Sequence, residues 1–230
     1  MSRLLCLVPA RGGSRGVPGK NLRVVAGKPL IVWTIEHALA LGDTDVVVST
    51  DDEAIAGVAR DAGAAVPFLR PADLARDETP TEPVVEHALD SLGTEPSAVL
   101  LLQATSPVRL PGTLARAVEQ FEADGVDSMV GVVPQPPFVW ELRPDGAPVA
   151  SYDVANRLRR QDMGPADLRY RETGSLYLTR PAVYREQHNR LGGRISLFVM
   201  DEVEGVDVDT EADLAAAEQR LTDLAGRADL

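Results

Sequence analysis

Short runs of consecutive apolar residues recur along this chain, and segments with helical features separate them. The runs cover residues 3–9, 45–49, 64–69, 98–103 and 128–134. Apolar runs without polar alternation are typical of strands that are buried on both faces beneath helices. The intervening segments with helical features cover residues 29–42, 51–62, 81–92 and 111–124. This alternation predicts an α/β fold with a doubly wound, mostly parallel sheet and right-handed crossovers.

Local signals predict where the first helices begin. Pro29 suits the first turn of the first helix, because its missing N–H is not needed there. Thr50 and Glu53 have the spacing of a capping box and predict the start of the second helix. Thr81 or Glu82 is expected to open the third helix.

The alternating pattern stops at Pro134. Residues 134–172 contain prolines, aromatic residues and an arginine cluster without helical periodicity, which predicts a β-rich excursion from the sheet. Two strands and a short helix are expected beyond it, at residues 174–179, 195–200 and 181–188. We interpret residues 1–230 as a single domain that carries residues 134–172 as an arm.

The distribution of charge indicates a small anionic ligand. The net charge of −12 argues against nucleic acid as the main partner. Residues 1–35 nevertheless contain six cationic side chains and no acidic one, which leaves −18 for the rest of the chain. Only Lys20 and Lys28 are lysines among the 23 basic residues, and we interpret their retention as a sign of a chemical role.

Several classes of protein are disfavoured by the composition. No apolar run approaches the roughly 20 residues that a membrane-spanning helix needs, and the N-terminal run is too short for a signal peptide. These observations predict a cytoplasmic protein without a membrane partner. Cys6 stands alone in an apolar run, which predicts a buried thiol, and the three histidines are too scattered for a metal site.

A glycine-rich loop, PARGGSRGVPGKN at residues 9–21, follows the first expected strand and includes Arg11, Arg15 and Lys20. It does not fit the P-loop pattern, because five residues instead of four separate the relevant glycines and asparagine follows the lysine. It does not fit the dinucleotide fingerprint either. Loops after parallel strands lie at the ligand-binding edge of the sheet, and glycines allow the backbone to approach phosphates. We therefore predict a triphosphate loop; the alternative is a tight turn with solvated charges.

Two aspartates near the C-terminus, Asp207 and Asp209, are separated by one residue and would share one face of a strand. Mg²⁺ typically binds through one or two carboxylates together with substrate phosphates. Helix capping is the alternative role, but Thr210 and Asp213 already form a capping box for a final helix expected over residues 210–225. The pair therefore predicts a metal site.

Two further groups have the chemistry of substrate recognition. Gln103 ends the most hydrophobic strand, and its amide can both donate and accept hydrogen bonds to a base or a sugar. The stretch RLRRQD at residues 157–162 contains three arginines that could bind a carboxylate bidentately. Satisfying loop backbone is the alternative for Gln103, and a solvated charge run is the alternative for the arginines.

A series of motifs in order along the chain resembles the N-acylneuraminate cytidylyltransferases, also called CMP-sialic acid synthetases. The motifs are VPARGGSRGVPGKN, the segment at residues 49–81, LLQATSPVR, RRQD, RETGSLYLT and GVDVDTEADL. Ala104 stands where the family usually has proline, and Thr173 stands where it often has asparagine. The resemblance implies a Rossmann-like nucleotidyltransferase fold. It also implies transfer of CMP from CTP to the anomeric hydroxyl of a nine-carbon α-keto acid sugar, with release of pyrophosphate.

The resemblance assigns roles to individual residues. Arg11, Lys20 and Asp209 would be catalytic, with Lys20 offsetting charge on the α-phosphate and Asp209 helping to deprotonate the attacking hydroxyl. Asp207 and Asp209 would bind Mg²⁺ or Mn²⁺. The implied nucleotide-binding residues are Pro9, Ala10, Arg11, Gly12, Ser14, Lys20, Asn21, Arg70 and Thr81. The implied sugar-binding residues are Gln103, Arg159, Arg160, Gln161, Thr173 and Tyr177.

Members of this family are dimers whose arm completes the sugar pocket of the partner, so the resemblance implies a homodimer. Arg159 or Arg160 of the arm would then reach the sugar carboxylate in the other subunit. Two alternatives remain open on the sequence. One is another sugar nucleotidyltransferase, such as a 3-deoxy-octulosonate cytidylyltransferase or a relative that uses GTP. The other is a non-catalytic nucleotide-binding module.

Overall fold

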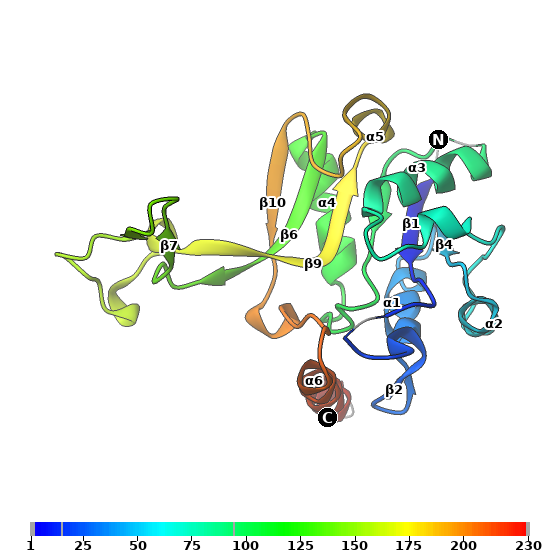
Figure 1. The fold of residues 1–230 in the computed structure, drawn as a ribbon, viewed down its shortest axis with the longest axis horizontal. Helices are drawn as coiled ribbons and strands as arrows, with labels where there is room; N and C mark the ends of the chain where they lie inside the picture. The colour runs from blue at the N-terminus through cyan, green and yellow to red at the C-terminus, as the bar shows by residue number, and fades with distance from the viewer. Residues whose placement is uncertain (1–2, 15, 94, 229–230) are drawn as a thin grey trace.

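A six-stranded mixed sheet forms the centre of the computed structural model, which describes residues 3–14, 16–93 and 95–228 (Figure 1). The strand order is β10-β6-β9-β5-β1-β4, and β9 is antiparallel to both of its neighbours. The other pairs, β1 with β4, β1 with β5 and β10 with β6, are parallel. The strands are β1 (Leu4–Pro9), β4 (Thr44–Ser49), β5 (Val99–Leu101), β6 (Ser128–Gln135), β9 (Arg169–Thr179) and β10 (Ile195–Val199).

Helices cover both faces of this sheet, so the predicted doubly wound α/β fold is confirmed. One face packs against α1 (Leu30–Leu39), α2 (Glu53–Asp61) and α4 (Thr113–Asp124). The other face packs against α3 (Thr81–Leu92) and α5 (Pro181–Gln187). Each layer buries the apolar stripe of its helices, as the helical periodicity predicts. In the described residues, no helix has the length and apolarity that crossing a bilayer requires.

The predicted start of α2 was wrong in detail. Asp52 is the N-cap residue, and its carboxylate accepts hydrogen bonds from the N–H groups of Ala54 and Ile55 at 2.8 and 3.0 Å. Thr50 does not pair with Glu53, because it is still part of the extended chain and forms an isolated β-bridge with Leu69. The strongest local acceptor therefore stands two residues later than the capping-box pattern indicates.

The predicted strand at 64–69 is only an extended segment. Two isolated parallel bridges connect it to the end of the sheet, one from Val47 to Ala65 and one from Thr50 to Leu69. Pro67 stands between them and has no N–H to donate, which accounts for the interruption of the ladder.

An arm extends away from the sheet between β6 and β9 (Figure 1). The residues outside the sheet are 136–168, because β6 continues to Gln135 and β9 already begins at Arg169. A two-stranded hairpin of β7 (Trp140–Leu142) and β8 (Pro148–Ala150) forms its β structure, as the interpretation as a β-rich excursion expects. Two short 3₁₀ turns, at Arg160–Asp162 and Pro165–Asp167, lead back into the long strand β9.

The segment that contains Asp207 and Asp209 is a loop, so the predicted strand geometry was wrong. This loop leads into α6 (Glu211–Ala228), and the N–H of Val208 donates to the carbonyl of Thr105 at 2.8 Å. The Val208 side chain is buried in a third apolar cluster, against Val17 of the glycine loop and residues of α6. Burial of Val208 turns the aspartates on either side of it outward from that cluster. The predicted capping pair Thr210 and Asp213 is confirmed, with bonds of 2.8 and 3.2 Å.

Candidate active site

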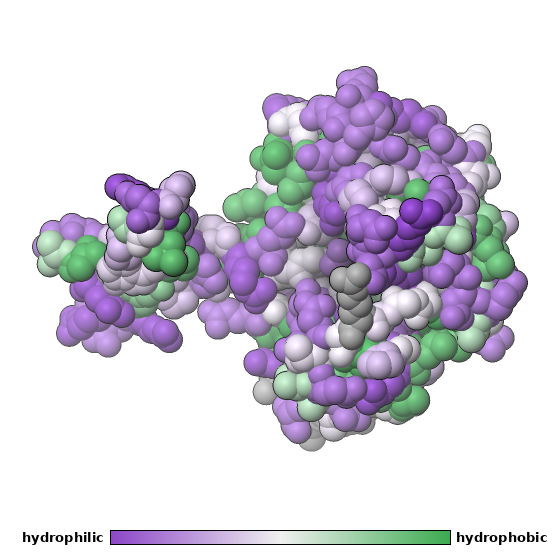
Figure 2. All heavy atoms as spheres, viewed as in Figure 1, coloured by the Kyte–Doolittle hydropathy of each residue, from purple (hydrophilic) through white to green (hydrophobic). Residues whose placement is uncertain are grey.

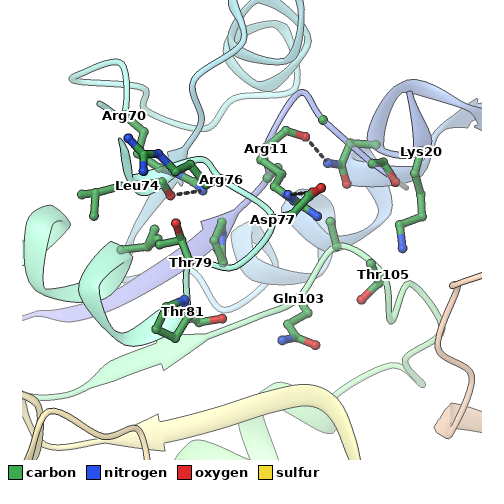
Figure 3. A pocket seen from close by; sticks show the side chains of 18 of the residues that line it. Arg11, Lys20, Arg70, Leu74, Arg76, Asp77, Thr79, Thr81, Gln103 and Thr105 are labelled. Carbon is green, nitrogen blue, oxygen red and sulfur yellow. Dashed lines mark hydrogen bonds and ion pairs between the residues drawn. The ribbon is translucent and has the colours of Figure 1, made fainter. Parts of the chain in front are cut away.

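A cavity of about 340 Å³ opens at the carboxyl ends of β1 and β5 (Figure 3). It is lined by the glycine loop, the segment that connects α2 to α3, the end of β5 and the loop before α6. Chain segments from opposite ends of the sequence therefore meet in one place. The predicted site residues that line it are Pro9, Ala10, Arg11, Ser14, Lys20, Asn21, Arg70, Thr81, Gln103, Asp207 and Asp209.

Three predicted cations face this cavity, and each is held by other groups of the chain. Arg11 forms an ion pair with Asp77. The Lys20 ammonium donates to the carbonyl of Val208, lies 3.3 Å from Oδ1 of Asp209, and its side chain is only 12% exposed. These cations thus line the cavity while they are paired with acceptors of the chain itself.

Arg70 is the most buried of these cations. Its guanidinium donates to the hydroxyl and carbonyl of Ser49 and to the carbonyl of Leu74. Burial lowers the pKa of Arg70 to about 10, which leaves the group cationic at neutral pH. Because its donors are engaged with protein acceptors, Arg70 stiffens the wall of the cavity and also contributes positive charge to it.

Other residues of the glycine loop shape the backbone. The buried Asn21 side chain donates from Nδ2 to the Arg11 carbonyl at 3.0 Å, which fixes the curvature of the loop (Figure 3). The N–H of Gly12 donates to Asp51 at 3.0 Å, and Gly12 does not line the cavity. Arg15, the third predicted cation of the loop, lies outside the described residues.

Gly16 brings the two halves of the site into contact. A Cβ atom placed on Gly16 would lie 2.0 Å from the carbonyl oxygen of Asp209, so no side chain can be accommodated there without a shift of backbone. The requirement for glycine at this position comes from that close approach. The glycine loop and the aspartate loop are thus in direct backbone contact.

Asp207 and Asp209 have different environments. Asp209 is 75% exposed, whereas Asp207 is half-buried and hydrogen-bonded by the hydroxyls of Thr105 and Ser106. Burial raises the pKa of Asp207, and the neighbouring charge of Asp209 raises it further. No group of three metal-binding side chains exists among the described residues. Two carboxylates fit a hard cation whose other ligands come from water and a bound phosphate.

Gln103 lies at the opposite side of the cavity from the glycine loop, next to a second constrained glycine. Gly174 of β9 has a φ of +71°, and a Cβ there would lie 2.5 Å from the Gln103 side-chain oxygen. Ser106 links the same region to the aspartates, because its hydroxyl lies 3.2 Å from the Thr173 carbonyl and 3.5 Å from Asp207.

Two predicted sugar-binding residues are buried in the sheet and do not line the cavity. The hydroxyl of Thr173 donates to the carbonyl of Gly131 at 3.0 Å. The hydroxyl of Tyr177 donates to Glu172, and the Arg190 guanidinium lies 5.1 Å from the ring centroid. In this structure both hydroxyls are therefore engaged with protein groups.

The remaining predicted sugar-binding residues, Arg159, Arg160 and Gln161, are exposed on the arm and do not line the cavity of their own chain. Arg159 forms a bidentate pair with Asp162, with bonds of 2.5 and 3.1 Å. Within one chain, the arginines of the arm therefore do not share a cavity with the cations of the glycine loop.

Sequence reasoning missed four polar residues that also line the cavity. They are Arg76, Asp77, Thr79 and Thr105 (Figure 3). Arg76, Asp77 and Thr79 belong to a connection that carries no periodic signal, and Thr105 sits beside the predicted Gln103. The density of charged and hydroxyl groups between Arg70 and Thr81 was the available signal, because such a segment must be placed in solvent or against a ligand.

The fold has close counterparts among solved structures. A CMP:2-keto-3-deoxy-manno-octonic acid synthetase in complex with CTP matches with a TM-score of 0.72 at 18% identity, over 96% of this chain and 99% of that one. A 4-diphosphocytidyl-2C-methyl-D-erythritol synthase from Anaerococcus prevotii matches with a TM-score of 0.68 at 10% identity, again over 96% and 99%. These likenesses show the class of fold: an α/β protein with a mostly parallel sheet that is covered by helices on both faces.

The sequence itself specifies the family. The profile of the family described as cytidylyltransferase matches residues 5–201. A CMP-N,N'-diacetyllegionaminic acid synthase of Legionella pneumophila is 36% identical over 95% of this chain and 96% of its own length. A pseudaminic acid cytidylyltransferase of Campylobacter jejuni is 32% identical over 93% and 94%. The chain belongs to the cytidylyltransferase family.

Some relatives are longer than this chain. The N-acylneuraminate cytidylyltransferase of Oncorhynchus mykiss is 35% identical over 95% of this chain but only 50% of its own length. The chain therefore spans about half the length of that relative and nearly all of the two bacterial ones.

Proposed function

We propose that this protein transfers CMP from CTP to the anomeric hydroxyl of an acidic α-keto sugar and releases pyrophosphate. The observation that carries the proposal is the single cavity in which Arg11 and Lys20 face Asp207 and Asp209. Cations suited to a triphosphate and carboxylates suited to a divalent cation are the two requirements of nucleotidyl transfer. The names of the relatives, which describe cytidylyltransferases for acidic sugars, support the choice of nucleotide and acceptor.

The cations would bind and orient the nucleotide. Arg11 and Lys20 would exchange their internal carboxylate partners for phosphate oxygens, with Lys20 close to the α-phosphate. Thr81 is the first residue of α3, so the N-terminus of that helix adds partial positive charge to the same wall. The backbone at Pro9–Arg11 would contact the pyrimidine edge of the base.

The aspartates would hold Mg²⁺ or Mn²⁺ together with the phosphates. When bound, such a cation offsets charge on the phosphates and acidifies a coordinated hydroxyl. Asp209 would accept the proton of the anomeric hydroxyl as the new oxygen–phosphorus bond forms. The bond between the α-phosphorus and the bridging oxygen breaks, and its electron pair leaves with pyrophosphate. Positioning and charge stabilisation provide most of the rate, and no covalent intermediate is required.

The decisive experiment is a pyrophosphate-release panel with four nucleotides against several acceptors. We expect release only with CTP, Mg²⁺ and an acidic α-keto sugar together. Nine-carbon acids, an eight-carbon 3-deoxy acid and a simple sugar 1-phosphate distinguish the acceptor classes. Activity with the sugar 1-phosphate and none with keto acids would reject the proposal. Preference for GTP would favour the GTP-using alternative, and no turnover with any pair would favour a non-catalytic nucleotide-binding module.

We also propose that the protein is a homodimer assembled through the arm. Exposed apolar side chains occur there among polar ones (Figure 2). Trp140 is 53% and Leu142 is 77% exposed. Contiguous apolar groups on a protruding segment are typical of a protein interface. A partner's arm would bring Arg159 or Arg160 to the sugar side of the cavity, next to Gln103. The use of CTP supports the predicted cytoplasmic location, which stays a prediction.

A mixing experiment tests the contribution of the arm in trans. Two variants are needed: the double variant Arg159→Ala/Arg160→Ala, which alters the arm, and Asp209→Asn, which alters the cavity. If the arm serves the partner's site, each variant is inactive as a homodimer. When the two inactive proteins are exchanged in equal amounts, about a quarter of wild-type activity per site is expected to return, because heterodimers rebuild one intact site. Sedimentation of each variant verifies that dimers persist. No recovery in verified heterodimers would mean that the arginines act on their own chain or not at all.

A further inference from the structure

The contact between Arg11 and Asp77 crosses the nucleotide cavity. Arg11 comes from the glycine loop after β1, and Asp77 comes from the connection before α3. Their side chains form an ion pair and are each 31% exposed. Figure 3 shows the two side chains pointing toward one another, joined by a dashed line. Both residues line the cavity, so a carboxylate of the chain itself occupies a position beside a predicted phosphate-binding cation.

Asp77 differs from the aspartates of the proposed metal site in its location. Asp207 and Asp209 lie on the loop before α6, where the Lys20 ammonium is 3.3 Å from Asp209. Asp77 lies on the connection before α3, which also carries Arg70 and Arg76, and it is paired with Arg11 of the glycine loop. A carboxylate that pairs with a cation of the cavity has the charge of the anionic ligand that is expected there. It therefore competes with a phosphate for the same guanidinium.

We propose that Asp77 is a positioning residue that acts through Arg11. Its carboxylate orients the Arg11 guanidinium toward the cavity, is displaced when a phosphate of the nucleotide arrives, and recaptures Arg11 as pyrophosphate departs. This inference rests on the proposed function, because it assigns Arg11 to the triphosphate. Phosphate displaces the carboxylate because it carries more charge and more acceptor oxygens for the same guanidinium.

Replacing Asp77, which competes with phosphate for Arg11, is expected to tighten the binding of anions to the cavity. Both side chains of this ion pair are 31% exposed, and solvent-screened pairs of this kind contribute modestly, so the competition between Asp77 and a bound anion is expected to be of modest size. We therefore expect Asp77→Asn to bind inorganic pyrophosphate about twofold to fivefold more tightly than the wild type. Product inhibition by pyrophosphate strengthens by the same factor, and release of pyrophosphate slows.

The test is calorimetric titration with inorganic pyrophosphate and with CTP, in the absence of any acceptor. The variants are Asp77→Asn, Arg11→Ala and the double variant. In the Arg11→Ala background, the tightening caused by Asp77→Asn is expected to disappear. Asp73→Asn is the matched control, because it removes the same charge from the same connection at an exposed residue that does not line the cavity.

Each outcome decides the inference. It is overturned if Asp77→Asn binds pyrophosphate equally or more weakly, if Asp73→Asn gives the same gain, or if the gain persists without Arg11. Absence of pyrophosphate binding to any variant also overturns it. The two proposals can fail separately. If Asp77→Asn tightens pyrophosphate binding only when Arg11 is present, but the protein releases no pyrophosphate in the panel, the inference is supported and only the proposed reaction is rejected.

Discussion

The substitution Asp209→Asn is expected to lower kcat for pyrophosphate release by about a thousandfold or more. A bound divalent cation supplies several kcal/mol of charge stabilisation, and each 1.4 kcal/mol changes the rate by a factor of about ten. Asp209→Asn removes one carboxylate of the proposed cation site and the proposed proton acceptor. The same change at Asp207 is expected to have an effect of similar size. The measurement is the initial rate at saturating CTP and acceptor across a titration of Mg²⁺.

The fold is expected to survive these substitutions. Asp209 is 75% exposed, and its contact with Lys20 is a partly exposed ion pair of small energetic value. Asp223→Asn on α6 is the matched control, because Asp223 is exposed and accepts a bond from Gln219 at 2.8 Å, outside the cavity. It is expected to retain the wild-type rate. If Asp209→Asn keeps more than a tenth of the wild-type kcat with an unchanged melting temperature, the proposed role of Asp209 is wrong.

Gly16→Ala is expected to lower kcat/KM about a hundredfold, since a displacement on the order of 1 Å in a catalytic constellation can cost that much. The added methyl would start 2.0 Å from the Asp209 carbonyl oxygen, so either the glycine loop or the aspartate loop must move. Either movement separates the phosphate-binding cations from the proposed metal site. Steady-state kinetics with CTP as the varied substrate, together with thermal unfolding, measures the effect.

A second glycine gives the control for this substitution. Gly57 lies within α2, and a Cβ there meets nothing within 4 Å. Gly57→Ala is expected to leave kcat/KM unchanged and to stabilise the fold by about 0.5–1 kcal/mol, because glycine is unfavourable inside a helix. A Gly16→Ala variant within threefold of the wild-type kcat/KM would show that the close backbone approach is not needed for activity.

The layered fold was predictable from the sequence because burial on both faces leaves a direct mark on it. The apolar runs at residues 3–9 and 128–134 became β1 and β6, and the helical segments between the runs became α1 to α4. The position of β9 was not predictable in this way. Strand direction and order depend on pairing with distant strands, and an apolar run is the same whether its neighbours are parallel or antiparallel.

Some parts of the candidate site were indicated by the sequence and others were not. The glycine loop and the aspartate pair stood out because their residue types have few structural uses at that spacing. Asp77 and Arg76 did not, because a charged residue in a connection is most often solvated, and only the tertiary structure shows that this connection closes over the cavity. The strand geometry expected for Asp207 and Asp209 was wrong, since burial of Val208 holds them on a loop instead.

The sequence by itself determined the class of fold, and it predicted the glycine loop as one part of the site and a phosphate as its ligand, because periodicity, burial and charge act locally along the chain. Only the tertiary structure decided which of those groups meet. It brought Gly16 against the backbone of Asp209 and Arg11 against Asp77, and it left Arg159 and Arg160 on an arm outside the cavity of their own chain. Such contacts depend on how distant segments pack together, and no local pattern of residues encodes them.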